Sequence, residues 1–98
     1  MEKMPNIFII DNDPVSNFVS EKIISFLDIP RKITSFLSGE DALECMKDRS
    51  DLPDLILLDL DMPCMNGFQF LRALKKLNLE KKIEVIILST SVYSENID

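Results

Sequence analysis

Short apolar runs recur along the chain at regular intervals. Segments 6–10 (NIFII), 54–58 (DLILL) and 84–88 (EVIIL) are rich in aliphatic residues, and each is about as long as one strand. Runs of this kind are typical of parallel strands that are buried on both faces. A weaker run, 32–37 (KITSFL), predicts a further strand. The pattern therefore predicts a small parallel sheet.

Between these runs, apolar residues recur at helical spacing. Segment 14–27 predicts an amphipathic helix, with apolar residues at Val15, Phe18, Val19, Ile23, Phe26 and Leu27. Asp13 is suited to cap this helix, and Pro14 is suited to its first position. Ser38 is placed to cap a second helix, and a third helix is predicted over 67–77. Strands and helices therefore alternate from one end of the chain to the other.

This alternation predicts an α/β fold, in which an open parallel sheet carries helices on both faces. No repeat or linker interrupts the pattern, so a single domain is expected over residues 1–98. In sheets of this kind, ligands bind beyond the carboxyl ends of the strands. The residues predicted at that edge are Asp11, Asn12 and Asp13 after the first strand, Asp59 and Asp61 after the third, and Ser89 after the fourth.

Clustered carboxylates repel one another, so this edge predicts a bound cation. Oxygen ligands without histidine suit Mg²⁺, which keeps some of its waters and leaves room for a phosphate oxygen. A carboxylate beside such an ion can also attack a phosphoryl group and form an aspartyl phosphate. Asp59, in the middle of the predicted site, is best placed as this nucleophile, and the Ser89 hydroxyl could donate to a phosphoryl oxygen.

The composition narrows the possible functions. The chain has 17 acidic and 11 basic residues and a formal net charge of -6, which disfavours nucleic acid and anionic membrane as direct partners. No apolar run approaches the length of a membrane span, and the start of the chain lacks the order of a signal peptide. A cytoplasmic location is therefore expected. The absence of histidine excludes histidine-based catalysis and a phosphohistidine carrier.

Three segments closely resemble the receiver domain of two-component response regulators: FIIDNDP, LLDLDMPCMNG and VIILSTS. The resemblance runs from the first predicted strand to the last residue, and the Asp-x-x-Met-Pro-x-x-Asn-Gly pattern at 59–67 is specific. It implies a flavodoxin-like sheet with the strand order 2-1-3-4. It also implies a regulatory phosphoacceptor rather than an enzyme.

The resemblance further implies a role in phosphorelay signal transduction. Asp59 would accept a phosphoryl group from the phosphohistidine of a sensor histidine kinase or a phosphotransfer protein. Ser89 matches the family's switch hydroxyl, which changes the surface that a downstream protein target contacts. The residues that the resemblance implies for Mg²⁺ are Asp11, Asn12, Asp13, Asp59 and the main-chain carbonyl of Asp61.

The chain departs from the family pattern in two ways. Asn12 stands where the family usually has an acidic metal ligand, so weaker Mg²⁺ binding is expected unless Asp13 compensates. The printed chain also ends before the family's fifth strand, its last helix and the lysine that pairs with the phosphoryl group, which implies a receiver domain that is incomplete at its C-terminal side. Lys81 and Lys82 precede the fourth strand, at the wrong end of the sheet to replace that lysine. Segment 84–89 (EVIILS) is then expected at a sheet edge. The isolated chain is expected to be marginally stable, and either to self-associate through these residues or to need a missing segment in order to fold.

Two other interpretations stay open. LLDLDMP also satisfies the Asp-x-Asp signature of haloacid-dehalogenase-type phosphatases, with Asp59 and Asp61 as the pair. Placement argues against it, because that signature normally follows the opening strand, whereas Asp11 and Asp13 come first here. Asn12 and the absent lysine favour a third interpretation, a receiver-like interaction module that is not phosphorylated.

Overall fold

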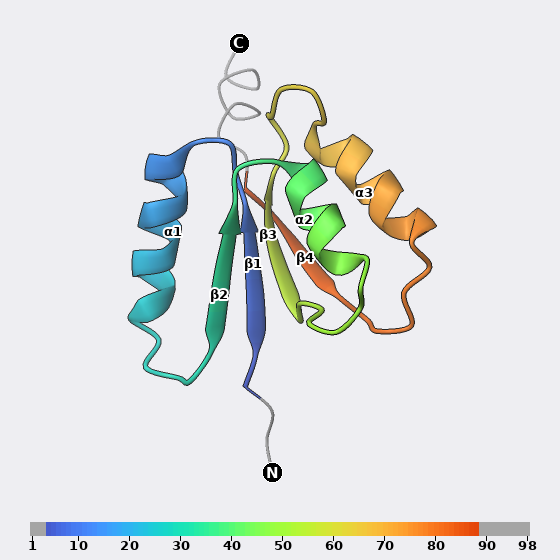
Figure 1. The fold of residues 1–98 in the computed structure, drawn as a ribbon. Helices are drawn as coiled ribbons and strands as arrows, with labels where there is room; N and C mark the ends of the chain where they lie inside the picture. Colours follow the sequence, from blue (N-terminus) through green and yellow to red (C-terminus); the bar gives the residue numbers. More distant parts are fainter. Residues whose placement is uncertain (1–3, 89–98) are drawn as a thin grey trace.

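The computed structural model describes residues 4–88 of the chain. Within them, strands and helices alternate as the sequence predicts (Figure 1). The elements are β1 Asn6–Ile10, α1 Pro14–Ser25, β2 Lys32–Phe36, α2 Gly39–Met46, β3 Leu55–Asp59, α3 Gly67–Lys76 and β4 Glu84–Leu88. In this part of the chain, no helix is long and apolar enough to cross a membrane.

The strands form one parallel sheet in the order β2-β1-β3-β4. The predicted fold class and strand order are therefore confirmed. β1 and β3 hold the central positions, and every residue of β1 is buried. The residues that follow these two strands consequently lie at the middle of the sheet's carboxyl edge.

Helices α2 and α3 cover one face of the sheet. The buried core on this face consists of Phe8, Ile10, Ala42, Leu43, Met46, Ile56, Leu58, Met62 and Phe70. Helix α3 is oriented as its apolar spacing predicts, because Phe70 is fully buried and Leu71, Leu74 and Leu77 pack against the same core. Burial of a side chain such as Phe70 stabilises the fold by about 1.5–3 kcal/mol.

Helix α1 covers the opposite face, but its apolar stripe points away from the sheet. The exposed apolar side chains of the α1 segment are Val15, Phe18, Val19, Ile23, Phe26 and Leu27. The buried residues of the helix are Asn17 and Ile24, and Ile24 packs with Ile7 and Ile9 of β1. The predicted helix is present, yet the stripe that made it amphipathic does not mark its buried side, as such a stripe usually does.

Polar contacts form on the side of α1 that meets the sheet. The Ser35 hydroxyl of β2 donates to the Glu21 carboxylate, and the Asn17 amide donates to the Asp11 carbonyl at 2.7 Å. At 100° per residue, Glu21 and Asn17 lie on the same side of the helix as Ile24. These partners come together only when the helix and both strands have assembled, so apolar periodicity could not reveal them.

Polar contacts also hold the amino end of the sheet together. The Asn6 side chain of β1 donates to the main-chain carbonyls of Asp51 and Leu52. The Lys81 ammonium group lies 2.8 Å from a carboxylate oxygen of Asp54, just before β3. Lys81 therefore lies at the opposite end of the sheet from the carboxyl edge, as the sequence predicted.

Candidate functional site

Two carboxyl groups meet at the centre of the carboxyl edge. Asp11 directly follows β1, and Asp59 is the last residue of β3. Because Ile10 lies opposite Leu58 in the sheet, the next residues, Asp11 and Asp59, lie side by side. In addition to burial, the negative charge of Asp11 raises the pKa of the Asp59 carboxyl group. The structure thus brings together two of the residues predicted for the site.

The pKa of the Asp59 carboxyl group is raised above its ordinary value. Burial is the main cause, because a carboxylate that leaves water loses hydration. The Asp61 N–H, which donates to Asp59 Oδ1 at 3.1 Å, lowers the pKa, whereas the negative charges of Asp11 and Asp61 raise it. The ionised form of Asp59 therefore lacks compensating positive charge, which a bound cation would supply.

Asp11 is held in place by groups from β2 and α1. Its N–H donates to the Phe36 carbonyl at 3.1 Å. One of its carboxylate oxygens accepts from the Asp13 N–H at 3.0 Å, and the other accepts from the Ser16 hydroxyl. Only 5% of Asp11 is exposed. The carboxylate is therefore presented to the site in one orientation.

The other residues predicted at this edge are more open. Asn12, Asp13 and Asp61 are exposed. Asp13 is the N-cap of α1, and its carboxylate accepts from the Val15 N–H at 3.0 Å, which confirms the predicted capping role. Ser89 lies outside the described residues.

A glycine allows the loop after Asp59 to pack closely. The Gly67 N–H donates to the Leu60 carbonyl at 3.0 Å. A Cβ on Gly67 would lie 2.5 Å from the Leu60 side chain and 2.8 Å from its Cα. Asn66 and Gln69 cap α3 reciprocally at the same place. The end of β3 and the start of α3 therefore form one tightly packed unit, in which a side chain at position 67 would displace backbone beside Asp59.

Between residues 4 and 88, no cluster of three or more Asp, Glu, Cys or His side chains is arranged to hold a metal ion. The Asp11 and Asp59 pair still suits Mg²⁺, which usually takes one or two carboxylates together with waters and phosphate oxygens. Repulsion between these two groups contributes to the raised pKa of Asp59, and a divalent ion relieves such repulsion. The residues present therefore fit the ion that the sequence implies.

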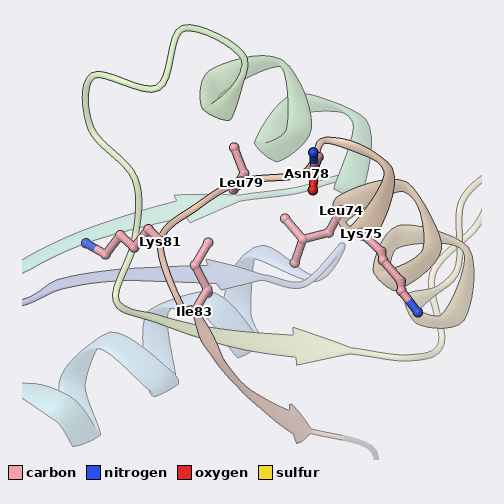
Figure 2. A pocket seen from close by; sticks show the side chains of 6 residues that line it. All are labelled: Leu74, Lys75, Asn78, Leu79, Lys81 and Ile83. Carbon is pink, nitrogen blue, oxygen red and sulfur yellow. The ribbon is translucent and has the colours of Figure 1, made fainter.

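A separate hollow of about 270 Å³ lies near the carboxyl end of α3 (Figure 2). It is lined by Leu74, Lys75, Asn78, Leu79, Lys81 and Ile83. The ammonium groups of Lys75 and Lys81 point away from it in different directions, and Lys81 is engaged in an ion pair. Because the hollow adjoins the segment before β4, it lies at the amino end of the sheet and forms no part of the site at Asp59.

Sequence reasoning missed Ser16 and Asn17, which reach Asp11 from α1. Neither residue stands out, because both are common polar residues within a predicted helix. A weak signal exists, since both follow the Asp13 cap within the first turns of the helix. Side chains there tilt back toward the preceding loop, which in this chain is the acidic segment.

Comparison with known proteins agrees with this geometry. The sequence model of the response regulator receiver domain matches residues 7–97. The chain is 37% identical over 84 residues to the protein-glutamate methylesterase/protein-glutamine glutaminase of Treponema denticola, covering 86% of this chain and 22% of that protein. It is 32% identical over 91 residues to the nitrate/nitrite response regulator protein NarL of Escherichia coli K12, covering 93% of this chain and 40% of that protein. The chain thus spans less than half the length of either relative.

Solved structures share the fold. The phosphorylated cyanobacterial phytochrome response regulator RcpA is similar with a TM-score of 0.81 and 25% identity, covering 97% of this chain and 71% of that one. The family match favours the receiver over the haloacid-dehalogenase-type phosphatase. With the sheet order β2-β1-β3-β4 and a family match over residues 7–97, the chain belongs to the response regulator receiver domain family of two-component signalling.

Proposed function

We propose that this chain is a phosphoacceptor in a phosphorelay and that Asp59 takes the phosphoryl group. The position of Asp59 carries the proposal, because it ends a central strand beside Asp11 and has a raised pKa caused mainly by burial. Carboxyl groups with shifted pKa values are frequent in functional sites. In open parallel sheets, such sites lie beyond the carboxyl ends of the strands. The relative RcpA is described as phosphorylated, which supports the same chemistry for this chain.

In the proposed reaction, the Asp59 carboxylate is the nucleophile. The Asp61 N–H holds Oδ1 of Asp59 at 3.1 Å, which leaves Oδ2 to attack the phosphorus atom of the donor's phosphohistidine. The O–P bond forms while the P–N bond breaks, and the electron pair stays on the imidazole nitrogen, which takes up a proton from water. Asp59 then carries the phosphoryl group as an acyl phosphate.

Mg²⁺ is the cofactor of this proposal. The residues proposed to hold it are the carboxylates of Asp11 and Asp59, the side chains of Asn12 and Asp13, and the main-chain carbonyl of Asp61. When bound, the ion would offset the negative charge of the carboxylates and of the phosphoryl oxygens. Asn12 contributes no charge, so weaker binding than in an Asn12→Asp variant is expected. Equal Mg²⁺ affinities in a titration of both proteins would place Asn12 outside the ligand set.

The proposed partners are proteins. A sensor histidine kinase or a phosphotransfer protein would donate the phosphoryl group, and a downstream protein target would respond to it. Ser89 is proposed as the switch hydroxyl that changes the surface seen by this target. A net charge of -6 disfavours nucleic acid and anionic membrane as further partners. The proposed role is regulatory rather than enzymatic, and the proposed location is the cytoplasm.

Labelling with acetyl phosphate and Mg²⁺ tests the assignment. The chain should take up a single hydroxylamine-sensitive phosphoryl group, and Asp59→Asn should abolish it. Asp61→Asn is the control, because it removes a neighbouring charge but keeps the main-chain carbonyl, and it should remain labelled. Label that persists in Asp59→Asn would overturn the assignment. Sustained hydrolysis of a generic phosphate ester would indicate a phosphatase, and a parent chain without label would indicate an interaction module.

A further inference from the structure

A buried amide joins the two ends of the acidic segment between β1 and α1. Asn17 Nδ2 donates to the Asp11 carbonyl at 2.7 Å and to the Asp13 carbonyl at 3.3 Å. The main-chain N–H of Asn17 also donates to the Asp13 carbonyl, at 3.0 Å. Only 4% of Asn17 is exposed. One side chain on the sheet-facing side of α1 therefore holds the backbone on both sides of Asn12.

The orientation of this amide follows from its neighbours. Both partners of Nδ2 are carbonyl oxygens, which accept from an NH₂ group and not from an amide oxygen. The Oδ1 atom of Asn17 is buried and has no hydrogen-bond partner in the described part of the chain. A buried polar atom in that state lowers stability. The Asn17 amide therefore lowers the stability of the fold through its oxygen, while its NH₂ group holds the acidic segment.

We propose that Asn17 is a positioning residue for the phosphorylation site, acting through Asp11. The contacts form a short chain: Asn17 holds the carbonyl of Asp13, and the N–H of Asp13 holds a carboxylate oxygen of Asp11 at 3.0 Å. Asp11 in turn lies against Asp59. Because Asn12 brings no charge to this edge, Mg²⁺ binding depends more strongly on correct placement of the remaining carboxylates. The inference rests on the proposed function of Asp59.

The chain provides a matched control at the other end of β1. Asn6 is also buried and donates its Nδ2 to the main-chain carbonyls of Asp51 and Leu52, and its Oδ1 has no hydrogen-bond partner among residues 4–88. The unpaired oxygen is therefore not what marks Asn17 as functional. The two residues differ in the carbonyls that they hold, since only those of Asn17 belong to the acidic segment.

Thermal unfolding of the 98-residue chain over a series of Mg²⁺ concentrations separates positioning from stability. Asn17→Ala should weaken Mg²⁺ binding about tenfold or more, as is usual when a group that orients metal ligands is lost. The rise in Tm at a given Mg²⁺ concentration should therefore shrink. The half-saturating Mg²⁺ concentration for acetyl phosphate labelling should rise by a similar factor, while saturating Mg²⁺ restores the parent's extent of labelling.

Asn6→Ala should lower the Tm of the metal-free chain and leave the Mg²⁺ affinity at the parent's value. If Asn17→Ala does not fold, Asn17→Ser replaces it, because the hydroxyl keeps one donor, and an intermediate Mg²⁺ affinity is expected. Unchanged Mg²⁺ affinity in the Asn17 variants, or an equal loss in Asn6→Ala, would overturn the inference. A parent chain that neither binds Mg²⁺ nor takes up label would instead refute the proposed function, and the positioning role with it.

Discussion

At the scale of single residues, the site is a pair of neighbouring carboxyl groups at the ends of two central strands. Asp11 is fixed by hydrogen bonds from α1 and from its own loop. Asp59 is partly buried and is held by a single described hydrogen bond, from the Asp61 N–H. Among the described residues, Asp59 thus accepts fewer hydrogen bonds that stabilise its ionised form than Asp11 does, so the charge state of Asp59 should affect the stability of the fold.

Ionisation of Asp59 should oppose folding of the metal-free chain. Its pKa is raised from 3.8, mainly by burial. A raised pKa in the folded state contributes stability that is complete below the unfolded-state pKa and is lost as the pH rises through the folded-state pKa. Asp59→Asn cannot ionise, so it should raise the free energy of unfolding at neutral pH, and its advantage should shrink as the pH falls toward 3.8. Urea unfolding at a series of pH values measures this difference.

Mg²⁺ provides the internal control for this titration. The ion should stabilise the parent more than Asp59→Asn, because only the parent carries the second carboxylate. If the gain in free energy of unfolding from Asp59→Asn does not change with pH, then the fold does not raise the pKa of Asp59.

Gly67 and Gly39 each begin a helix, and an added methyl group should have a much larger effect at Gly67 than at Gly39. At Gly67 the Cβ would lie 2.8 Å from the Cα of Leu60, beside Asp59. Gly67→Ala should therefore lower the free energy of unfolding by about 1–3 kcal/mol and slow acetyl phosphate labelling. At Gly39 the nearest atoms are side-chain atoms of Met65 and Phe70, at 3.1 Å.

Gly39→Ala is the matched control. Both close contacts at Gly39 are with side-chain atoms, so Met65 and the ring of Phe70 would each have to shift by only a few tenths of an ångström. Alanine also favours a helix by up to about 1 kcal/mol over glycine. Stability close to the parent's and unchanged labelling are expected. Urea unfolding and a labelling time course measure both variants. Equal behaviour of the two would show that close packing at Gly67 does not shape the site.

At the scale of elements, α1 is the helix whose orientation departs from its apolar pattern. Ile23 and Ile24 are adjacent residues of the same type, with exposed fractions of 61% and 8%. Ile24→Ala should lower the free energy of unfolding by about 2 kcal/mol or more, because it leaves a cavity against β1. Ile23→Ala should change it by less than about 0.5 kcal/mol. Urea unfolding of the two variants decides the orientation, since a helix with its apolar stripe against the sheet would make Ile23→Ala the more damaging change.

At the scale of the whole molecule, β4 forms one edge of the sheet that the structure describes. The Glu84 N–H donates to the Asp54 carbonyl at 3.0 Å. Alternation along the strand then turns the N–H and C=O groups of Val85 and Ile87 away from β3. The β4 strand of a second copy could pair with this strand in the antiparallel direction, with the two Ile86 residues opposite each other on a two-fold axis. Each of these N–H and C=O groups would then have a hydrogen-bond partner. Glu84 is the single charged residue of the strand and offers little protection against such pairing.

Self-association through β4 is therefore expected for the 98-residue chain. Size-exclusion chromatography with light scattering should give a mass that rises with protein concentration. Ile87→Pro should keep the chain monomeric, because it removes an outward N–H without removing a bond to β3. A parent mass that stays monomeric at every concentration would contradict this expectation.

The sequence by itself determined the order of elements, the parallel sheet and the acidic carboxyl edge. These features follow from local patterns, because a fully buried strand such as β1 must be apolar over its whole length and a helix is stabilised by a cap at its start. The segments 6–10, 32–37, 54–58 and 84–88 match the observed strands to within a residue at each end. Helix α3 followed for the same reason, since its apolar spacing matches the side that it buries.

Only the tertiary structure decided which side of α1 is buried and how Asp11 is held. Both depend on polar partners that are distant in sequence or belong to another element: Ser35 with Glu21, and Asn17 with the Asp11 carbonyl. The spacing of apolar residues reflects the tendency of their side chains to be buried. It does not reveal which residue will donate a hydrogen bond to a buried backbone carbonyl, and such a carbonyl needs a donor. In α1 the side that meets this need is the buried one, and the apolar stripe is exposed. The raised pKa of Asp59 likewise depends on the tertiary structure, because it comes mainly from burial and in part from the charge of Asp11 on the neighbouring strand end.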